Sequence, residues 1–153
     1  MFMRIFFLFS LICLLLASSC VRSKDDCPGN LLDKGDDRLT IVNNSSENIS
    51  FTFSFQYPQD SGYLAAYVPT VQSINSDPIW NVDPNSSKKY RSRGCWTAGF
   101  DQLFPSGKMH ILIFNIDSVK AYPAGEIISR GLYKSYLYTL DDLKANNWQV
   151  VYP

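Results

Sequence analysis

The chain has 153 residues, of which 46% are hydrophobic, and its 14 Lys and Arg residues balance its 14 Asp and Glu residues. Because there is neither a net charge nor an acidic or basic tail, no long-range field would attract nucleic acid, and no nucleic-acid partner is expected. The length suits one globular domain once the N-terminal segment described next is set apart.

Residues 1–19 have the layout of a secretory signal peptide. Arg4 gives the N-terminus a positive charge, an apolar run extends over 5–17 with only Ser10 interrupting it, and small residues follow at 17–19. The apolar run is shorter than the roughly 20 residues that a helix needs to cross a bilayer. We therefore predict cleavage before Cys20, with an uncleaved membrane anchor as the alternative.

Cys20 is predicted to carry lipid. The segment Leu16-Ala17-Ser18-Ser19-Cys20 resembles the lipobox of bacterial lipoproteins, although its leucine stands one position earlier than usual. In that class the cysteine thiol is acylated and the cysteine becomes the first residue of the mature chain. Several acyl chains hold a protein stably on a membrane. The membrane is thus an expected partner, and cleavage without lipid attachment stays open.

Residues 20–37 are predicted to form a lipidated tether, which leads to a single β-rich domain over 38–153. Within the tether, Lys24, Asp25 and Asp26 are similar to the surface-export signal of Bacteroidota lipoproteins. We expect an outer-membrane lipoprotein exposed at the cell surface. A periplasm-facing protein with a merely solvated tether is the alternative.

Two of the four cysteines are available for a disulfide. Cys13 leaves with the signal peptide and Cys20 takes the lipid, so Cys27 and Cys95 remain. Disulfides persist outside the cytoplasm, and a bridge between these two residues is predicted. Closing so long a loop would be worth up to about 4 kcal/mol. Two unpaired thiols are the alternative.

The first half of the domain contains strand patterns separated by turn residues. Residues 39–42 suit a short strand. In 49–57 apolar residues alternate strictly with Ser, Thr and Gln, which is typical of a half-buried strand in an antiparallel sheet. The turn-forming segment 58–62 precedes a further strand candidate at 63–68.

The middle of the chain continues this pattern. Strands are predicted at 79–82 and 88–93, and the turn-forming residues 83–86 lie between them. Residues 108–117 carry apolar side chains on both faces, which predicts a central strand.

The C-terminal part mixes helix and strand signals. A short helix is predicted over 123–130 and a strand over 132–138. Residues 139–142 resemble a capping box, which predicts a second short helix, and 148–152 alternate as a final strand.

About seven short strands predict a mainly β fold: an antiparallel β-sandwich of immunoglobulin-like type, with one or two short helices near the C-terminus. The competing fold is α+β, with helices on one face of a sheet. The pattern leaves the strand order open.

Nearly the whole chain resembles a group of small lipoproteins of Bacteroides and related Bacteroidota. The resemblance is carried by residues 39–44, 83–86, 94–96 and 138–143 and by the ending Asn147-Trp148 and Tyr152-Pro153. It implies export and lipid attachment, and it implies no particular activity.

The residue sets of common enzymes are missing from the sequence. His110, the only histidine, lies in the apolar strand and is interpreted as a structural, hydrogen-bonded residue; a base that activates Cys95 is the alternative. There is no nucleophile elbow, phosphate loop or dinucleotide fingerprint, and one histidine with two cysteines cannot complete a four-ligand zinc site. We therefore expect no catalytic residue, metal or cofactor, although scattered carboxylates leave a hydrolase open.

Two surface motifs are candidates for contact or modification. Lys89, Arg91 and Arg93 share one face of the predicted strand and form a possible basic patch for an anionic partner. A charged edge that prevents sheet-to-sheet aggregation has the same pattern. Asp117-Ser118-Val119 resembles an O-glycosylation site of Bacteroides, which would place glycan on Ser118.

Together these features predict a lipid-anchored cell-envelope protein with a non-enzymatic binding or structural domain. Loops 58–62, 83–87 and 94–107 are candidate contacts for an unidentified protein or glycan. Most aromatic residues, including Trp96 and Trp148, are expected in the core. One alternative is a glycan-binding accessory lipoprotein, which requires exposed aromatic rings. The other is a protective or immunity lipoprotein that neutralises a toxin or a hydrolase.

Overall fold

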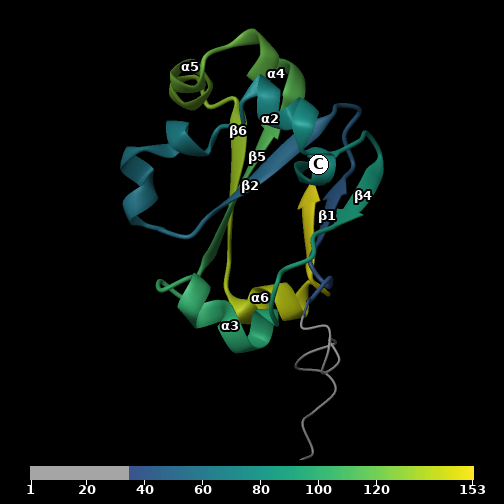
Figure 1. Ribbon diagram of the computed structural model, residues 1–153, viewed down its shortest axis with the longest axis vertical. Helices are drawn as coiled ribbons and strands as arrows, with labels where there is room; N and C mark the ends of the chain where they lie inside the picture. The colour runs from purple at the N-terminus through teal and green to yellow at the C-terminus, as the bar shows by residue number, and fades with distance from the viewer. Residues whose placement is uncertain (1–34) are drawn as a thin grey trace, which may run out of the picture.

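The computed structural model describes residues 35–153, which form two β-sheets and several short helices (Figure 1). The strands are β1 (Thr40–Asn43), β2 (Ile49–Ser54), β3 (Asn81–Val82), β4 (Ser86–Lys89), β5 (Met109–Asn115), β6 (Tyr133–Tyr138) and β7 (Gln149–Tyr152). The α-helices are α2 (Val71–Ser76), α3 (Trp96–Leu103), α4 (Ile116–Ala121), α5 (Ala124–Ser129) and α6 (Leu140–Ala145). The 3₁₀ turns of the described residues are η2 (Gln59–Gly62), η3 (Leu64–Tyr67) and η4 (Pro78–Trp80). No helix within this part of the chain has the length and apolar character needed to cross a membrane.

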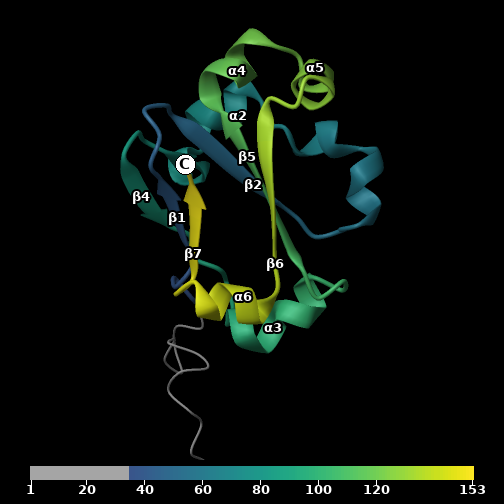
Figure 2. The same ribbon diagram turned by 180° about the vertical axis from the view of Figure 1, so that it is seen from behind.

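The strands are ordered β4-β1-β7 in one sheet and β3-β2-β5-β6 in the other (Figure 2). All pairs are antiparallel except β1 with β7, which run parallel. The prediction is confirmed in part: the strands form two sheets, and helices accompany them. An all-β immunoglobulin-like sandwich is not confirmed. The placement of helices only near the C-terminus is wrong, because α2 and α3 lie in the middle of the chain.

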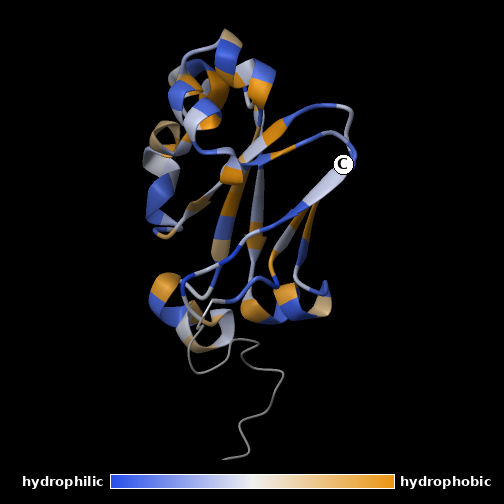
Figure 3. Cartoon of the chain, turned by 45° about the vertical axis from the view of Figure 1, so that its right-hand side comes forward, coloured by the Kyte–Doolittle hydropathy of each residue, from blue (hydrophilic) through white to orange (hydrophobic). Residues whose placement is uncertain are grey.

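Strand β5 is the centre of the fold because both of its faces are buried. Met109, Ile111 and Ile113 face the core between the two sheets, whereas Leu112 and Phe114 face a second core under α2, α4 and α5. Figure 3 shows hydrophobic and hydrophilic segments along the strands, and helices that carry residues of both kinds. The predicted central strand is therefore confirmed.

The neighbouring strand β2 departs from the sequence-based expectation. Its apolar residues Ile49, Phe51 and Phe53 are buried in the core between the sheets, as predicted. Its polar face is buried as well, since Ser50 and Ser54 are 1% and 0% exposed. The strand is not half-buried, because the chain after it folds back over the face that carries the hydroxyl groups.

The chain crosses between the two sheets four times, and one buried side chain stabilises the first two crossings. Asn43, at the end of β1, is fully buried. Its amide nitrogen donates to the carbonyl oxygens of Glu47 at 2.7 Å and Asp83 at 3.0 Å, and its amide oxygen accepts from the Ser45 backbone at 3.1 Å. The β1–β2 and β3–β4 connections are thereby held side by side.

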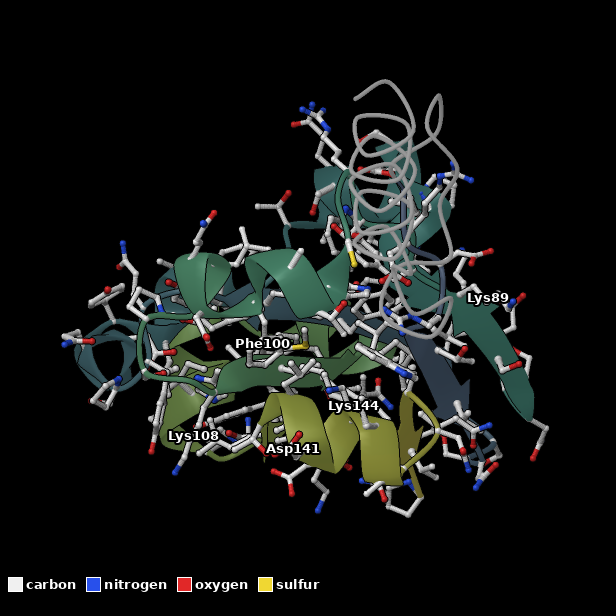
Figure 4. The ribbon with its side chains drawn as sticks, turned by 90° about the horizontal axis from the view of Figure 1, so that it is seen from below. Lys89, Phe100, Lys108, Asp141 and Lys144 are labelled. Carbon is white, nitrogen blue, oxygen red and sulfur yellow. The ribbon has the colours of Figure 1, made fainter. Side chains whose placement is uncertain are left out.

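Helices α3 and α6 close the lower end of the space between the sheets. Phe100 points from α3 into the interior, whereas Lys108, Asp141 and Lys144 lie on the outside (Figure 4). The predicted capping box of α6 is confirmed: Thr139 accepts from the Asp142 backbone at 3.1 Å, and the Asp142 carboxylate accepts from the Thr139 backbone at 2.8 Å. Both Trp96 and Trp148 are buried, as expected.

Other local expectations need correction. The segment 63–68 forms the 3₁₀ turn η3 and not a strand. The strand expected over 88–93 begins and ends earlier, at Ser86–Lys89. Asp36, assigned to the tether, is fully buried and pairs through its backbone with Ser92, so the fold begins before residue 38.

The contrast between two phenylalanines of the same alternating segment tests this core. We expect Phe51→Ala to lower the free energy of unfolding by about 3–5 kcal/mol, because it leaves a cavity between the sheets. Phe55 is 48% exposed, and Phe55→Ala should cost about 1 kcal/mol or less. Urea unfolding of the two variants measures the difference. Equal destabilisation would contradict the burial of Phe51 and the exposure of Phe55.

Candidate functional site

A groove runs beside one edge of β2. Strand β3 pairs only with Ile49 and Ser50, so no described strand covers the rest of this edge. The segment from Ala66 to Ile74 and the ring of Trp80 lie next to it and enclose a cavity of about 410 Å³. We call this cavity the β2 groove.

The groove combines aromatic walls with hydroxyl groups. Its aromatic residues are Phe53, Phe55, Tyr67 and Trp80, and its hydroxyl residues are Ser50, Thr52, Thr70 and Ser73. None of the described residues that line it is charged. Apolar walls with a few converging polar groups are the usual chemistry of a small-ligand site.

Most of these hydroxyl groups already have partners. Thr52 Oγ1 donates to the Tyr67 carbonyl at 3.1 Å, which attaches the far wall of the groove to the sheet. Thr70 caps α2 by accepting from the Ser73 backbone at 3.0 Å, and Ser73 Oγ donates to the Thr70 carbonyl at 2.8 Å. The groove is therefore held in shape by its own side chains.

Ser50 is the exception. Ser50 is one of the residues that line the groove, it is only 1% exposed, and its buried hydroxyl oxygen has no hydrogen-bond partner among the described residues. Buried polar atoms are nearly always hydrogen-bonded, and an unpaired one costs about 1–3 kcal/mol. Because this oxygen is itself buried, a ligand in the groove reaches it and supplies the missing partner only if the Ser50 side chain rotates.

Phe55 lines both the β2 groove and a second hollow. Its ring stacks on Phe104 with centroids 5.3 Å apart and remains 48% exposed. The second hollow, of about 480 Å³, is lined by residues 55–59 with Pro105 and Ser106. Two of the loops predicted as contacts, 58–62 and 94–107, thus meet beside the exposed ring. The third loop, 83–87, lies elsewhere, at the turn into β4.

A buried polar chain lies on the same face of this sheet, nearer to β6. His110 Nδ1 is 2.5 Å from Asp60 Oδ2, and His110 Nε2 is 2.7 Å from Ser135 Oγ. Asp60 is fully buried and His110 is 4% exposed, whereas Ser135 is exposed. The sequence analysis singled out His110 alone. Its partners stand 50 and 25 residues away, and no local motif marks them.

A second buried carboxylate stabilises the point where the described chain begins. Asp36 Oδ2 accepts from Arg38 Nη2 at 2.7 Å and from the Trp96 backbone N–H at 3.0 Å. The Arg38 guanidinium also lies over the ring of Trp148, 4.2 Å from its centroid. Asp36 therefore joins the start of the fold to α3 and to the residue before β7.

The other predicted site residues are spread over the molecule. Cys95 is disulfide-bonded, but Cys27, its predicted partner, lies outside the described residues, as do Cys20, Lys24, Asp25 and Asp26. Ser118 is half-buried in the first turn of α4, and its backbone N–H donates to the Asn115 side chain.

The predicted basic patch is divided by the end of β4. Lys89 lies in the strand, 3.9 Å from Asp37, whereas Arg91 and Arg93 follow it, and Arg91 packs against Gly35. The three side chains therefore do not share a strand face, because the strand ends at Lys89.

Within residues 35–153, no group of three or more His, Cys, Asp or Glu side chains is placed to hold a metal ion. The chain matches no protein-family model, no curated protein and no solved structure.

The Asp36 contacts predict a specific loss of stability in acid. Burial alone would raise the pKa of Asp36, but hydrogen bonds from Arg38 and Trp96 to the ionised form lower it below 3.8. A carboxyl group with a depressed pKa in the folded state stabilises the protein fully above its unfolded pKa of about 3.9, and this contribution is lost as the pH falls through the folded value. We expect Asp36→Asn to cost about 2–3 kcal/mol at pH 7, because it removes hydrogen bonds to a charged group.

Urea unfolding between about pH 7 and pH 2.5 measures this effect, because these limits lie on either side of the unfolded pKa. The difference in the free energy of unfolding between the wild type and Asp36→Asn should become smaller as the pH approaches about 2.5. Asp37→Asn is the matched control, since its side chain is 53% exposed. If the destabilisation by Asp36→Asn is the same at every pH, the ionised carboxylate of Asp36 does not stabilise the fold as argued.

Proposed function

We propose that this protein is a lipid-anchored cell-envelope lipoprotein whose domain binds a neutral glycan in the β2 groove. The observation that carries the binding proposal is a cavity walled by aromatic rings, one of whose lining residues, Ser50, has a buried hydroxyl without a partner among the described residues. The anchor rests on the signal-peptide pattern and on Cys20. Surface display rests on Lys24, Asp25 and Asp26, and a periplasm-facing position remains the alternative.

The chemistry of the groove favours a neutral sugar over other ligands. Sugar rings present apolar C–H faces that pack on aromatic side chains, and hydroxyl groups that can both donate and accept hydrogen bonds. The groove offers both kinds of contact and no charge among its described lining residues. An anionic ligand would find no cation there.

The exposed ring of Phe55 provides a test of the glycan proposal. We would screen the full chain against neutral oligosaccharides, with sulfated oligosaccharides as the anionic comparison, and measure hits by calorimetry. Phe55→Ala removes the packing of this ring on the sugar. It should weaken the free energy of binding by about 1.5 kcal/mol or more, which raises Kd about tenfold or more. Tyr122→Ala is the matched control, because Tyr122 is 36% exposed and does not line the groove.

Ser50→Ala separates binding from folding at the same site. Removing a hydroxyl that has no partner should leave stability unchanged or raise it, and it should weaken the binding of the same oligosaccharide. If no neutral oligosaccharide binds, or if Phe55→Ala and Ser50→Ala bind as tightly as the wild type, the glycan proposal is wrong.

The anchor is tested independently of the ligand. Cys20→Ala should move the protein from the membrane fraction to the soluble fraction, because the acyl chains that hold it on the bilayer are attached to this thiol. Replacing Lys24, Asp25 and Asp26 together by alanine should protect the domain from protease added to intact cells. Unchanged membrane association of Cys20→Ala would refute the lipid anchor, and unchanged protease sensitivity would refute the surface signal.

A further inference from the structure

The buried chain of Asp60, His110 and Ser135 has the geometry of a nucleophile, a base and an orienting carboxylate. An ionised carboxylate can only accept hydrogen bonds, so in the contact with Asp60 the His110 Nδ1 carries the proton. In the neutral ring with this tautomer, Nε2 has a lone pair that can accept from the Ser135 hydroxyl, whose oxygen lies 2.7 Å away. Each contact is within the hydrogen-bond reach that such a system requires.

The fold gives each group a distinct environment. Asp60 is held in η2, where its backbone N–H donates to Gln56 at 3.2 Å and its carbonyl accepts from Tyr63 at 2.9 Å. The edge of the Tyr57 ring packs against His110, with centroids 5.3 Å apart. The orienting carboxylate and the base are therefore shielded from water, while Ser135 is an exposed residue.

Ser135 is also accessible from the side. It lies in β6, the edge strand of its sheet, and within residues 35–153 no strand pairs with the outer side of β6. An edge strand presents unpaired backbone N–H groups, which can donate to the carbonyl oxygen of a bound ester. Residues two apart on a strand share a face, so Tyr133 and the 39% exposed Leu137 flank the hydroxyl.

We propose that Asp60, His110 and Ser135 form a hydrolytic centre that cleaves carboxylic esters with an apolar acyl group. The same arrangement of side chains occurs on unrelated folds and in different chain orders, and it is recognised by its geometry. Asp60 is a positioning residue, whereas His110 and Ser135 contact the reacting atoms. This activity goes beyond glycan binding and departs from the sequence-based expectation of a non-enzymatic domain.

The reaction balances with water as the only co-reactant. Ser135 Oγ attacks the ester carbonyl carbon, and its proton passes to His110 Nε2. The bond between the carbonyl carbon and the alcohol oxygen breaks, and His110 returns the proton to the departing alcohol. Water then attacks the acyl-serine through the same base, the carboxylic acid leaves, and Ser135 recovers its proton. Asp60 stays ionised and stabilises the transient imidazolium.

A fluorophosphonate probe tests the nucleophile directly. The serine oxygen displaces fluoride from phosphorus, the fluoride leaves with the serine proton, and a phosphonyl group stays on the side chain. We would treat the full chain in detergent with the probe and locate the modified residue by peptide mass spectrometry. We expect modification of Ser135, none at that position in Ser135→Ala, and none at Ser129, which is also exposed.

The dependence on the base distinguishes catalysis from chance reactivity. His110→Gln should slow labelling by at least about a hundredfold, the usual contribution of a general base. Asp60→Asn should slow labelling and remove the far-downfield proton resonance expected of the 2.5 Å contact between Nδ1 and Oδ2. Urea unfolding shows whether each variant remains folded, and Asp60→Asn serves if His110→Gln does not fold.

The outcomes are decisive for this centre and independent of the groove. Wild-type protein that is folded but unlabelled at Ser135, labelling confined to other serines, or an unchanged rate in folded His110→Gln or Asp60→Asn would each overturn the proposal. Tyr122→Ala should be labelled at the wild-type rate, because Tyr122 lies outside the Asp60–His110–Ser135 chain and does not line the groove. A wild-type protein that is labelled at Ser135 but binds no neutral oligosaccharide would refute only the glycan proposal. One that binds an oligosaccharide but is not labelled at Ser135 would refute only the hydrolytic centre.

Discussion

The burial of β5 on both faces is the constraint on which the rest of the structure depends. A strand whose residues alternate between two apolar faces cannot border water on either side, so each face needs its own cover. The sheet β4-β1-β7, with α3 and α6, covers one face, while α2, α4 and α5 cover the other. The mixed fold follows from this requirement, because the chain has too few long strands to cover both faces with sheet.

The position of His110 follows from the same constraint. It is the one strongly polar side chain within the buried part of β5, and a buried imidazole needs hydrogen-bond partners. Asp60 comes from the segment that folds over the sheet, and Ser135 comes from the adjacent strand β6. A requirement of folding thus places a base beside an exposed hydroxyl.

The β2 groove has a different origin. Strand β3 is short because the chain crosses to the other sheet after Val82, where the Asn43 side chain holds the crossing. The edge of β2 beyond Ser50 is left without a strand, and η3, α2 and Trp80 lie beside it. The groove is therefore a consequence of how the two sheets are connected, and its hydroxyl groups come from the polar face of the alternating strand.

The sequence by itself determined the local features of the domain. The apolar run of β5, the alternation of β2 and the capping box of α6 were all predictable, because each depends on residues a few positions apart. Helix α3 has a readable signal as well, since Trp96, Phe100, Leu103 and Phe104 follow helical spacing. The predicted loop 94–107 is therefore wrong over Trp96–Leu103.

Only the tertiary structure decided which side chains meet. It buried the polar face of β2 and brought Asp60 and Ser135 to His110. It also left Ser50 without a partner and made Asp36 part of the fold. The physical reason is that periodicity specifies the face on which a residue lies, whereas its neighbours across that face depend on strand order, register and the path of distant segments.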